Sequence, residues 1–282
     1  MVGIRDFFDR TDKLMPHFIG NLNADWSEIM SRLTTLRLSR VRAPNSVEEN
    51  FQVLRNLKLG VSWVIEAGCH DGSDTEKMLT LEGINKIYAF EPDTAARNIA
   101  KSRLARFSSR QLSISPYALM DYQGIFGIDF QGLPGSGSTQ VRRSNQSNDH
   151  EIVQAIALDD FEIEELSNGF LWLDVEGVAH EVLAGGIQTL QKISARNLEV
   201  EFYDMSESRR TSFKKITRTL RSQGFGIWAS DIHPGYFGNI FAVRSKLLPP
   251  HKRIIMEARY LRLLLLYSFV YPALNKPEKR HA

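Results

Sequence analysis

The chain has 282 residues, of which 43% are hydrophobic and 24% are charged, and its formal net charge is +2. These values are ordinary for a folded globular protein and exclude an overall electrostatic bias toward nucleic acid. A single cysteine, Cys69, excludes an internal disulfide, and the acidic N-terminal stretch without a long apolar run argues against a signal peptide. We therefore expect a cytoplasmic protein.

Three regions are expected from the composition along the chain. Residues 1–45 are polar, with scattered apolar positions, and predict a helical extension. Residues 46–246 form the predicted main domain, and residues 247–282 a C-terminal segment that is apolar and basic. Apolar residues at helical spacing predict a helix over residues 47–59, directly before the first strand.

The stretch VSWVIEAGCHDG, residues 61–72, predicts a buried strand that ends at Glu66 and enters a tight turn at the start of a helix. The turn consists of Gly68, Cys69, His70, Asp71 and Gly72. Glycines permit positive φ and a close approach of the backbone, and Asp71 or Ser73 can cap the helix. Open α/β sheets bind nucleotides at such turns, but an ordinary strand-to-helix loop explains the glycines alone equally well.

A second signal lies about 20 residues beyond this turn. A helix over residues 74–81 leads to the strand KIYAF, residues 86–90, which ends at Glu91. An acid at this place can accept hydrogen bonds from both ribose hydroxyls of an adenosine ligand. The alternative is that Glu91 caps the helix that begins at Asp93.

The next elements complete a β-α-β-α-β unit, which is typical of parallel sheets. They are a helix over residues 94–107 and a strand over residues 111–115, followed by Tyr117 and Ala118, where backbone groups meet an adenine ring in such folds. Residues 124–130 predict a further strand. Residues 132–149 are rich in Gly, Ser, Asn and Gln and predict a loop, either a ligand cover or filler.

Two more acids follow the strand FLWLDV, residues 170–175. Asp174 and Glu176 are expected at the same edge of the sheet as Glu66 and Glu91, so four carboxylates converge there and need partners. Asp174 with Glu176 could instead hold Mg²⁺, but no third acid stands at ligand spacing, so we predict no metal. The remaining predicted elements are helices over 178–183 and 208–222, a strand over 197–203, and an antiparallel pair over 225–230 and 236–244.

Seven sequence blocks carry a family resemblance. They are EAGCHDG, YAFEPD, SPYALMD, SGST, ALDDF, LWLDVEGVAHEVLAGG and LEVEFY, in this order over residues 61–244. In this combination the chain resembles the FkbM family of S-adenosylmethionine (SAM)-dependent methyltransferases. The resemblance implies an α/β fold with a doubly wound, mostly parallel, seven-stranded Rossmann-like sheet and a C-terminal antiparallel strand pair. It also implies SAM as cofactor and O-methylation of a hydroxyl on a small molecule, sugar or glycan.

The resemblance further implies a role for individual residues. The implied cofactor-binding residues are Glu66, Gly68, His70, Asp71, Gly72, Glu91, Tyr117, Ala118 and Asp174, with Glu91 at the ribose. Two positions depart from the family pattern: His70 stands where Asn is usual, and His180 where a small or apolar residue or an acid is more usual.

Methyl transfer to a hydroxyl needs a base near the methyl group. Asp174, Glu176 and His180 are the candidate catalytic residues, with His180 one helical turn beyond Glu176. His233 is a further candidate, although both histidines could equally be surface residues.

Two other functions stay open at this stage. An NAD-dependent oxidoreductase would share the glycine turn and Glu91, but the turn lacks the G-x-G-x-x-G spacing. A non-catalytic SAM-fold binding protein would retain the fold without turnover, with His70 as the altered position.

The most apolar window, residues 261–274, is shorter than the roughly 20 residues of a membrane-spanning helix. Residues 251–274 therefore predict a homodimer interface, packing on the domain, or peripheral membrane contact.

Overall fold

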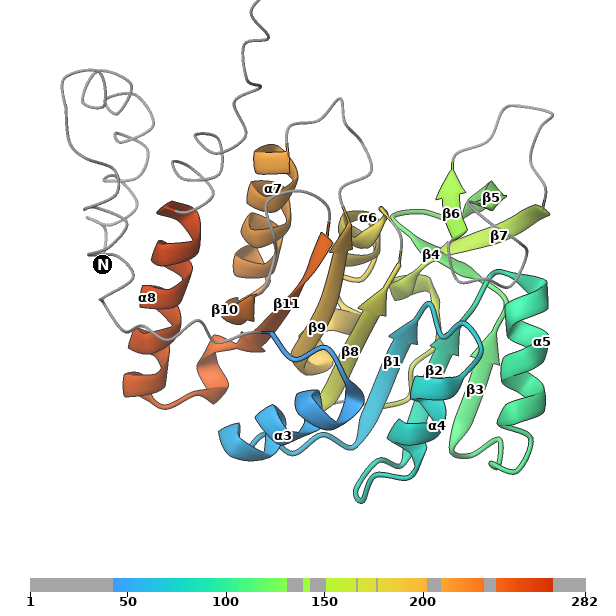
Figure 1. Cartoon of the computed structure of the whole chain (residues 1–282), viewed down its shortest axis with the longest axis horizontal. Helices are drawn as coiled ribbons and strands as arrows, with labels where there is room; N and C mark the ends of the chain where they lie inside the picture. Colours follow the sequence, from blue (N-terminus) through green and yellow to red (C-terminus); the bar gives the residue numbers. More distant parts are fainter. Residues whose placement is uncertain are drawn as a thin grey trace, which may run out of the picture. The chain divides into compact units, whose positions relative to one another are not determined.

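The computed structural model describes residues 43–130, 139–142, 151–165, 167–175, 177–201, 209–230 and 237–265. All of them belong to one compact unit, Val41–Ala282. Its central sheet has seven strands in the order β10-β11-β9-β8-β1-β2-β3 (Figure 1). These strands are β1 Trp63–Ala67, β2 Lys86–Phe90, β3 Leu112–Ser115, β8 Gly169–Asp174, β9 Ile193–Glu201, β10 Phe225–Ser230 and β11 Phe237–Arg244.

The sheet is parallel from β3 to β9, and β11 alone in it runs against its two neighbours, β9 and β10. The predicted doubly wound, mostly parallel, seven-stranded sheet with a C-terminal antiparallel pair is therefore confirmed. Central parallel strands are covered on both faces, which explains why β1 is buried along its whole length.

Helices cover both faces of this sheet. They are α3 Val47–Leu57, α4 Ser73–Leu79, α5 Thr94–Arg103, α6 Ala179–Ala184, α7 Arg209–Ser222 and α8 Pro250–Leu265. One buried core cluster joins Val64 of β1 to apolar residues of α3, α4 and α5 and to Met256 of α8. The other joins Ile65 of β1 to residues of α6 and α7. Successive side chains of a strand point to opposite faces, so β1 contributes to both layers.

A second sheet, which the sequence analysis did not predict as a unit, has four strands in the order β4-β7-β5-β6. Its strands are β4 Ala118–Met120, β5 Gly124–Phe130, β6 Thr139–Arg142 and β7 Glu151–Ala157. Figure 1 shows it near the ends of β2 and β3. Its buried residues Phe126, Val153 and Ala155 form a small core of their own with residues of β4.

Several boundaries predicted from the sequence are wrong. The helix predicted over residues 94–107 ends at Arg103. Residues 139–142, predicted as part of a loop, form β6, because this short segment finds a pairing partner in β5 that its polar composition does not reveal. Strand β9 begins at Ile193 rather than at residue 197, because the preceding residues pair with β8 and β11 and are buried there. The rest of the predicted 132–149 loop lies outside the described residues.

Helix α8 packs beside β10 and buries Met256, so residues 250–265 share the core of the main sheet. Within the described part of the chain, no helix has both the length and the apolar character that crossing a membrane requires. Short 3-10 helices complete the connections: η1 Leu158–Asp160, η2 Thr189–Lys192 and η3 Ser245–Leu247. Of the predicted N-terminal extension, residues 1–45, residues 1–42 lie outside the described residues.

Candidate active site at the carboxyl edge of the sheet

The turn between β1 and α4 lies against the ends of two neighbouring strands. The backbone N–H groups of Gly68 and Cys69 donate to the carbonyl of Phe90, at the end of β2, over 2.9 and 3.1 Å. Gly68 has φ +81, and a Cβ atom there would lie 1.9 Å from the carbonyl oxygen of Asp174, at the end of β8. Glycine is therefore required for the turn to reach β8.

Gly72 has a different task in the same turn. It is the N-cap of α4 with φ +78, and a Cβ atom there would meet Leu104 Cδ1 at 2.8 Å and Ala100 at 3.2 Å. The sequence predicted Asp71 or Ser73 as the cap of this helix; Gly72 occupies the N-cap position instead, and Asp71, one residue earlier, accepts a 3.0 Å hydrogen bond from the N–H of Ser73. Gly72 thus lets α4 and α5 pack closely and supports the turn indirectly.

Glu66, the last polar residue of β1, is 1% exposed. The hydroxyl of Thr75 in α4 donates to its Oε2 over 2.6 Å. Burial raises the pKa of Glu66 to about 8, with smaller contributions from the charges of Asp74, Asp174 and Glu91, while the hydrogen bond from Thr75 acts in the opposite direction. The carboxyl group is therefore mainly protonated at neutral pH.

Glu91 follows β2 and is 6% exposed. Its Oε2 accepts a hydrogen bond from the backbone N–H of His70 over 2.8 Å, and its Oε1 accepts one from the N–H of Asp93 over 2.9 Å. Burial raises the pKa of Glu91, and these two hydrogen bonds oppose the effect. The N-cap of α5 is Asp93, which accepts from the N–H groups of Ala95 and Ala96, so Glu91 is not the helix cap.

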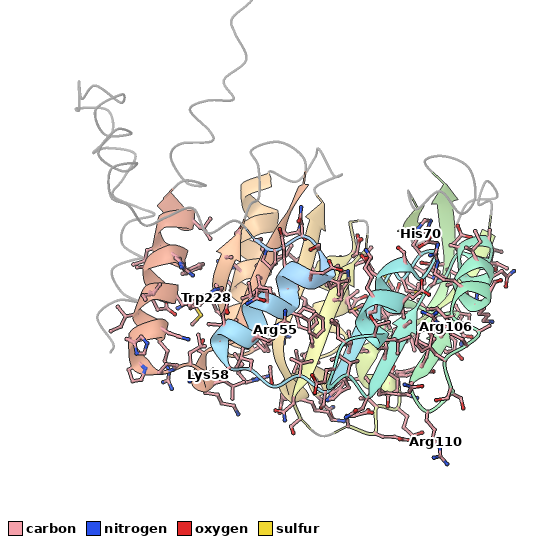
Figure 2. The ribbon with its side chains drawn as sticks, turned by 60° about the horizontal axis from the view of Figure 1, so that its bottom comes forward. Arg55, Lys58, His70, Arg106, Arg110 and Trp228 are labelled. Atoms are coloured by element: carbon pink, nitrogen blue, oxygen red, sulfur yellow. The ribbon has the colours of Figure 1, made fainter. Side chains whose placement is uncertain are left out.

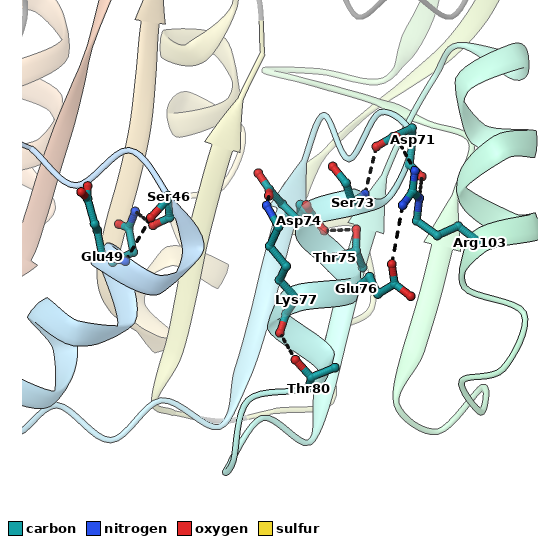
Figure 3. A network of polar contacts seen from close by, with 12 residues as sticks. Ser46, Glu49, Asp71, Ser73, Asp74, Thr75, Glu76, Lys77, Thr80 and Arg103 are labelled. Carbon is teal, nitrogen blue, oxygen red and sulfur yellow. Dashed lines mark hydrogen bonds and ion pairs between the residues drawn. The ribbon is translucent and has the colours of Figure 1, made fainter.

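Arginines of α5 hold both acidic turns in place. Arg97 donates to the carbonyls of Glu91 and Pro92 over 2.7 Å each. Arg103 donates to the Asp71 carbonyl over 2.9 Å and to its carboxylate over 2.7 Å, and it also lies 3.6 Å from Glu76 (Figure 3). The Asp71 carboxylate is thus engaged by α5 and by Ser73.

Asp174 ends β8 with an exposed side chain, and its charge acts on Glu66. The structure therefore brings Glu66, Glu91 and Asp174 together at the carboxyl edge of β1, β2 and β8. His180 lies in α6 and is half-buried. Glu176 and His233 lie outside the described residues.

Tyr117 and Ala118 follow β3 and lead into the second sheet. Tyr117 is partly buried against the core cluster that contains Leu119, and Ala118 is buried and pairs with Ala155 of β7. The predicted adenine position is thus the junction between the two sheets. Figure 2 shows His70, which lies in the turn between β1 and α4.

Two residues at the site were missed by the sequence analysis, Thr75 and Arg97. Each lies in the first turn of a helix, Thr75 in α4 and Arg97 in α5, directly after a loop that carries predicted site residues. This position in the sequence is the signal that could have identified them. Their roles follow from their contacts in the fold: Thr75 donates to the Glu66 carboxyl group, and Arg97 donates to the backbone carbonyls of Glu91 and Pro92.

The residues at this edge fit an adenosine-type cofactor with an amino-acid end. Each oxygen of the Glu91 carboxylate carries one backbone hydrogen bond in the described structure and has a second lone pair for a ribose hydroxyl. The exposed carboxylate of Asp174 provides the negative group that an ammonium group needs. Among the described residues, no group of three or more His, Cys, Asp or Glu could hold a metal ion.

Comparisons with known proteins agree with this geometry. The model of the methyltransferase FkbM domain family matches residues 66–227, more than half of the chain. The 2-O-methyltransferase NoeI of Sinorhizobium fredii (strain NBRC 101917 / NGR234) is 27% identical over 183 residues, which is 58% of this chain and 73% of that protein.

Crystal structures with a similar fold include methyltransferase FkbM from Methylobacillus flagellatus KT, at 14% identity and a TM-score of 0.45. The match covers 75% of this chain and 58% of that one. The N-terminal domain of EvdMO1 with SAH bound matches with a TM-score of 0.41 and 9% identity, over 78% of this chain and 97% of that one.

The seven-stranded sheet, with the glycine turn and the acid after β2 at its carboxyl edge, defines a SAM-dependent methyltransferase with a Rossmann-like fold. More particularly, the chain belongs to the FkbM methyltransferase family. The predicted family, enzyme class and cofactor are therefore confirmed.

Proposed function

We propose that the protein transfers the methyl group of SAM to a hydroxyl oxygen of a small molecule, a sugar or a glycan. The observation that carries this proposal is the joint placement of the glycine turn, Glu91 and Asp174 at one edge of the sheet. The name of the relative NoeI, a 2-O-methyltransferase, supports oxygen as the acceptor atom.

In this proposal Glu91 accepts hydrogen bonds from the ribose hydroxyls, and its two backbone partners keep the carboxylate in place beforehand. Tyr117 and Ala118 border the adenine. Glu66, Gly68 and His70 form the wall at the amino-acid end of the cofactor. Asp71 and Gly72 support this wall through their contacts with α5.

SAM supplies an electrophilic methyl group, which the acceptor oxygen attacks in line. The protein aligns the acceptor, excludes water and takes the hydroxyl proton. We assign the proton to the carboxylate of Asp174, because it ends β8 with an exposed side chain beside the glycine turn. His180 and Glu176 are the further candidates for this role.

Isothermal titration with SAM and, separately, with NAD tests the cofactor part of the proposal. We expect saturable binding of SAM and none of NAD, because the turn lacks G-x-G-x-x-G spacing. The acceptor part is tested by measuring demethylated cofactor formed with a panel of sugars, glycans and phenols. Tight SAM binding with no turnover on any hydroxyl would instead favour a non-catalytic binding protein.

The location of the protein and its larger partners belong to the proposal too. Cys69 is free and buried, which suits a reducing compartment such as the cytoplasm. We also propose that residues 251–274 contact a partner, which is either a second copy of the chain or the periphery of a membrane.

A further inference from the structure

Helix α8 has an inner face that is firmly attached to the domain. Met256 is buried, and Tyr260 and Leu263 pack against the core. Arg259 donates to the backbone carbonyl of Trp228 in β10 over 2.9 Å, and its guanidinium lies 4.5 Å from the centre of the Trp228 ring. Figure 2 shows Trp228 beside this helix. Because the inner face is packed against the domain, the opposite face of α8 points away from the domain.

The outer face of α8 carries apolar side chains that the domain does not cover. Ile254 is 71% exposed and Leu261 is 38% exposed. Ala258 stands between them at the i, i+4, i+7 spacing that places side chains on one line of a helix. Ile255, and Leu247 just before the helix, are exposed nearby. Exposed apolar residues that gather in this way mark a contact surface.

Positive charges surround this apolar line. Lys246 and Arg253 are exposed near its N-terminal end. The acid of this stretch, Glu257, is already paired with Arg221 of α7 over 2.9 Å. The outer face of α8 therefore combines apolar side chains with an excess of cations.

We infer that the outer face of α8 docks onto an anionic lipid surface, with the helix lying in the plane of the interface. Exposed apolar residues flanked by Lys and Arg are the features that bind such surfaces. A two-fold dimer through the same face would bring the Lys246 and Arg253 cations of both copies into one interface, which adds repulsion. Phosphate headgroups complement these cations instead. The inference does not depend on the proposed methyl transfer.

Co-sedimentation of the full chain with lipid vesicles tests this docking. We expect binding to vesicles of phosphatidylcholine mixed with phosphatidylglycerol and much weaker binding to vesicles of phosphatidylcholine alone. Added salt should weaken the binding, because salt screens the attraction between the cations and the headgroups.

The double variant Ile254→Ser with Leu261→Ser should lower the partition onto anionic vesicles by about tenfold or more, because it removes apolar area from the contact. Ile125→Ser is the matched control, since Ile125 of β5 is 74% exposed outside α8. This control should bind like the wild type. Both substituted positions lie at the surface, and circular dichroism would confirm that the fold is retained.

A second pair of variants tests the cations. Lys246→Gln with Arg253→Gln should lower the partition by about tenfold or more, at roughly 1 kcal/mol for each cation near the surface. Lys101→Gln with Arg110→Gln removes the same charge at exposed positions around β3, the other edge strand of the sheet, and should have little effect.

Three results would overturn the inference. The first is a wild-type protein that binds neither kind of vesicle. The second is vesicle binding that Ile254→Ser with Leu261→Ser leaves unchanged. The third is a wild-type dimer, seen in sedimentation velocity without vesicle binding, that the same double variant dissociates, since this face would then join two copies of the chain.

Discussion

The backbone N–H of His70 donates a 2.8 Å hydrogen bond to Oε2 of Glu91. This bond joins the turn after β1 directly to the acid after β2. His70 has φ +46, in the left-handed region that costs most non-glycine residues about 1 kcal/mol or more. In this conformation the backbone of the turn holds one carboxylate oxygen of Glu91, the residue that we propose binds the ribose.

Glu91→Ala should weaken SAM binding by about 100-fold or more. The variant loses two charge-assisted hydrogen bonds to the ribose, each worth roughly 1.5 to 3 kcal/mol. Isothermal titration measures the change. Because the N–H groups of His70 and Asp93 also lose their acceptor, thermal stability should fall as well. Asp160→Ala, at an exposed position, is the control. Unchanged SAM affinity in Glu91→Ala would contradict the ribose role.

Gly68→Ala should abolish SAM binding and lower the melting temperature. Its Cβ atom would lie 1.9 Å from the carbonyl oxygen of Asp174, in a backbone conformation with φ +81. The ends of β1 and β8 must then move apart. Gly60→Ala is a matched control, because no atom lies within 4 Å of a Cβ there. Differential scanning fluorimetry with and without SAM measures both effects. Equal behaviour of the two variants would mean that the turn is not packed against β8.

Glu66→Gln should change how stability depends on pH. The folded pKa of Glu66, about 8, lies above its ordinary value of 4.5, so the folded state holds the proton more tightly than the unfolded chain. Stability from this group is complete below pH 4.5 and is lost as pH rises to about 8, by about 1.4 kcal/mol per unit and roughly 5 kcal/mol in total.

The neutral amide removes this pH dependence. The melting temperature of Glu66→Gln, relative to the wild type, should therefore rise between pH 5 and pH 8. Asp160→Asn, at an exposed position, should show no such trend. A constant difference between Glu66→Gln and wild type over this pH range would show that Glu66 is ionised in the folded protein.

Asp174→Asn should lower kcat far more than it lowers SAM affinity if the carboxylate takes the acceptor proton. The amide keeps the size of the side chain and loses its basicity. Single-turnover kinetics with an accepted hydroxyl substrate, together with SAM titration, separates the two quantities. Parallel losses in both would make Asp174 a cofactor ligand instead of the base.

Local sequence determined most elements of the main sheet. The alternation and runs of apolar residues predicted β2 at its observed bounds, residues 86–90, and predicted both members of the β10–β11 pair. Gly68 and the acid about 20 residues later identified the cofactor edge. These signals are readable because strand periodicity, turn glycines and acid spacing each depend on a few neighbouring residues.

Long-range contacts decided the remaining features. The second sheet exists because β6 pairs with β5 and β4 with β7, and short strands carry too little local signal to reveal such partners. The sequence determined that Glu66 lies near the end of one strand and that Glu91 follows the next strand along the chain. Only the tertiary structure decided that Glu66 is buried and keeps its proton. It also decided that the backbone N–H groups of His70 and Asp93 donate to Glu91. Burial and hydrogen bonding depend on which segments of the chain meet.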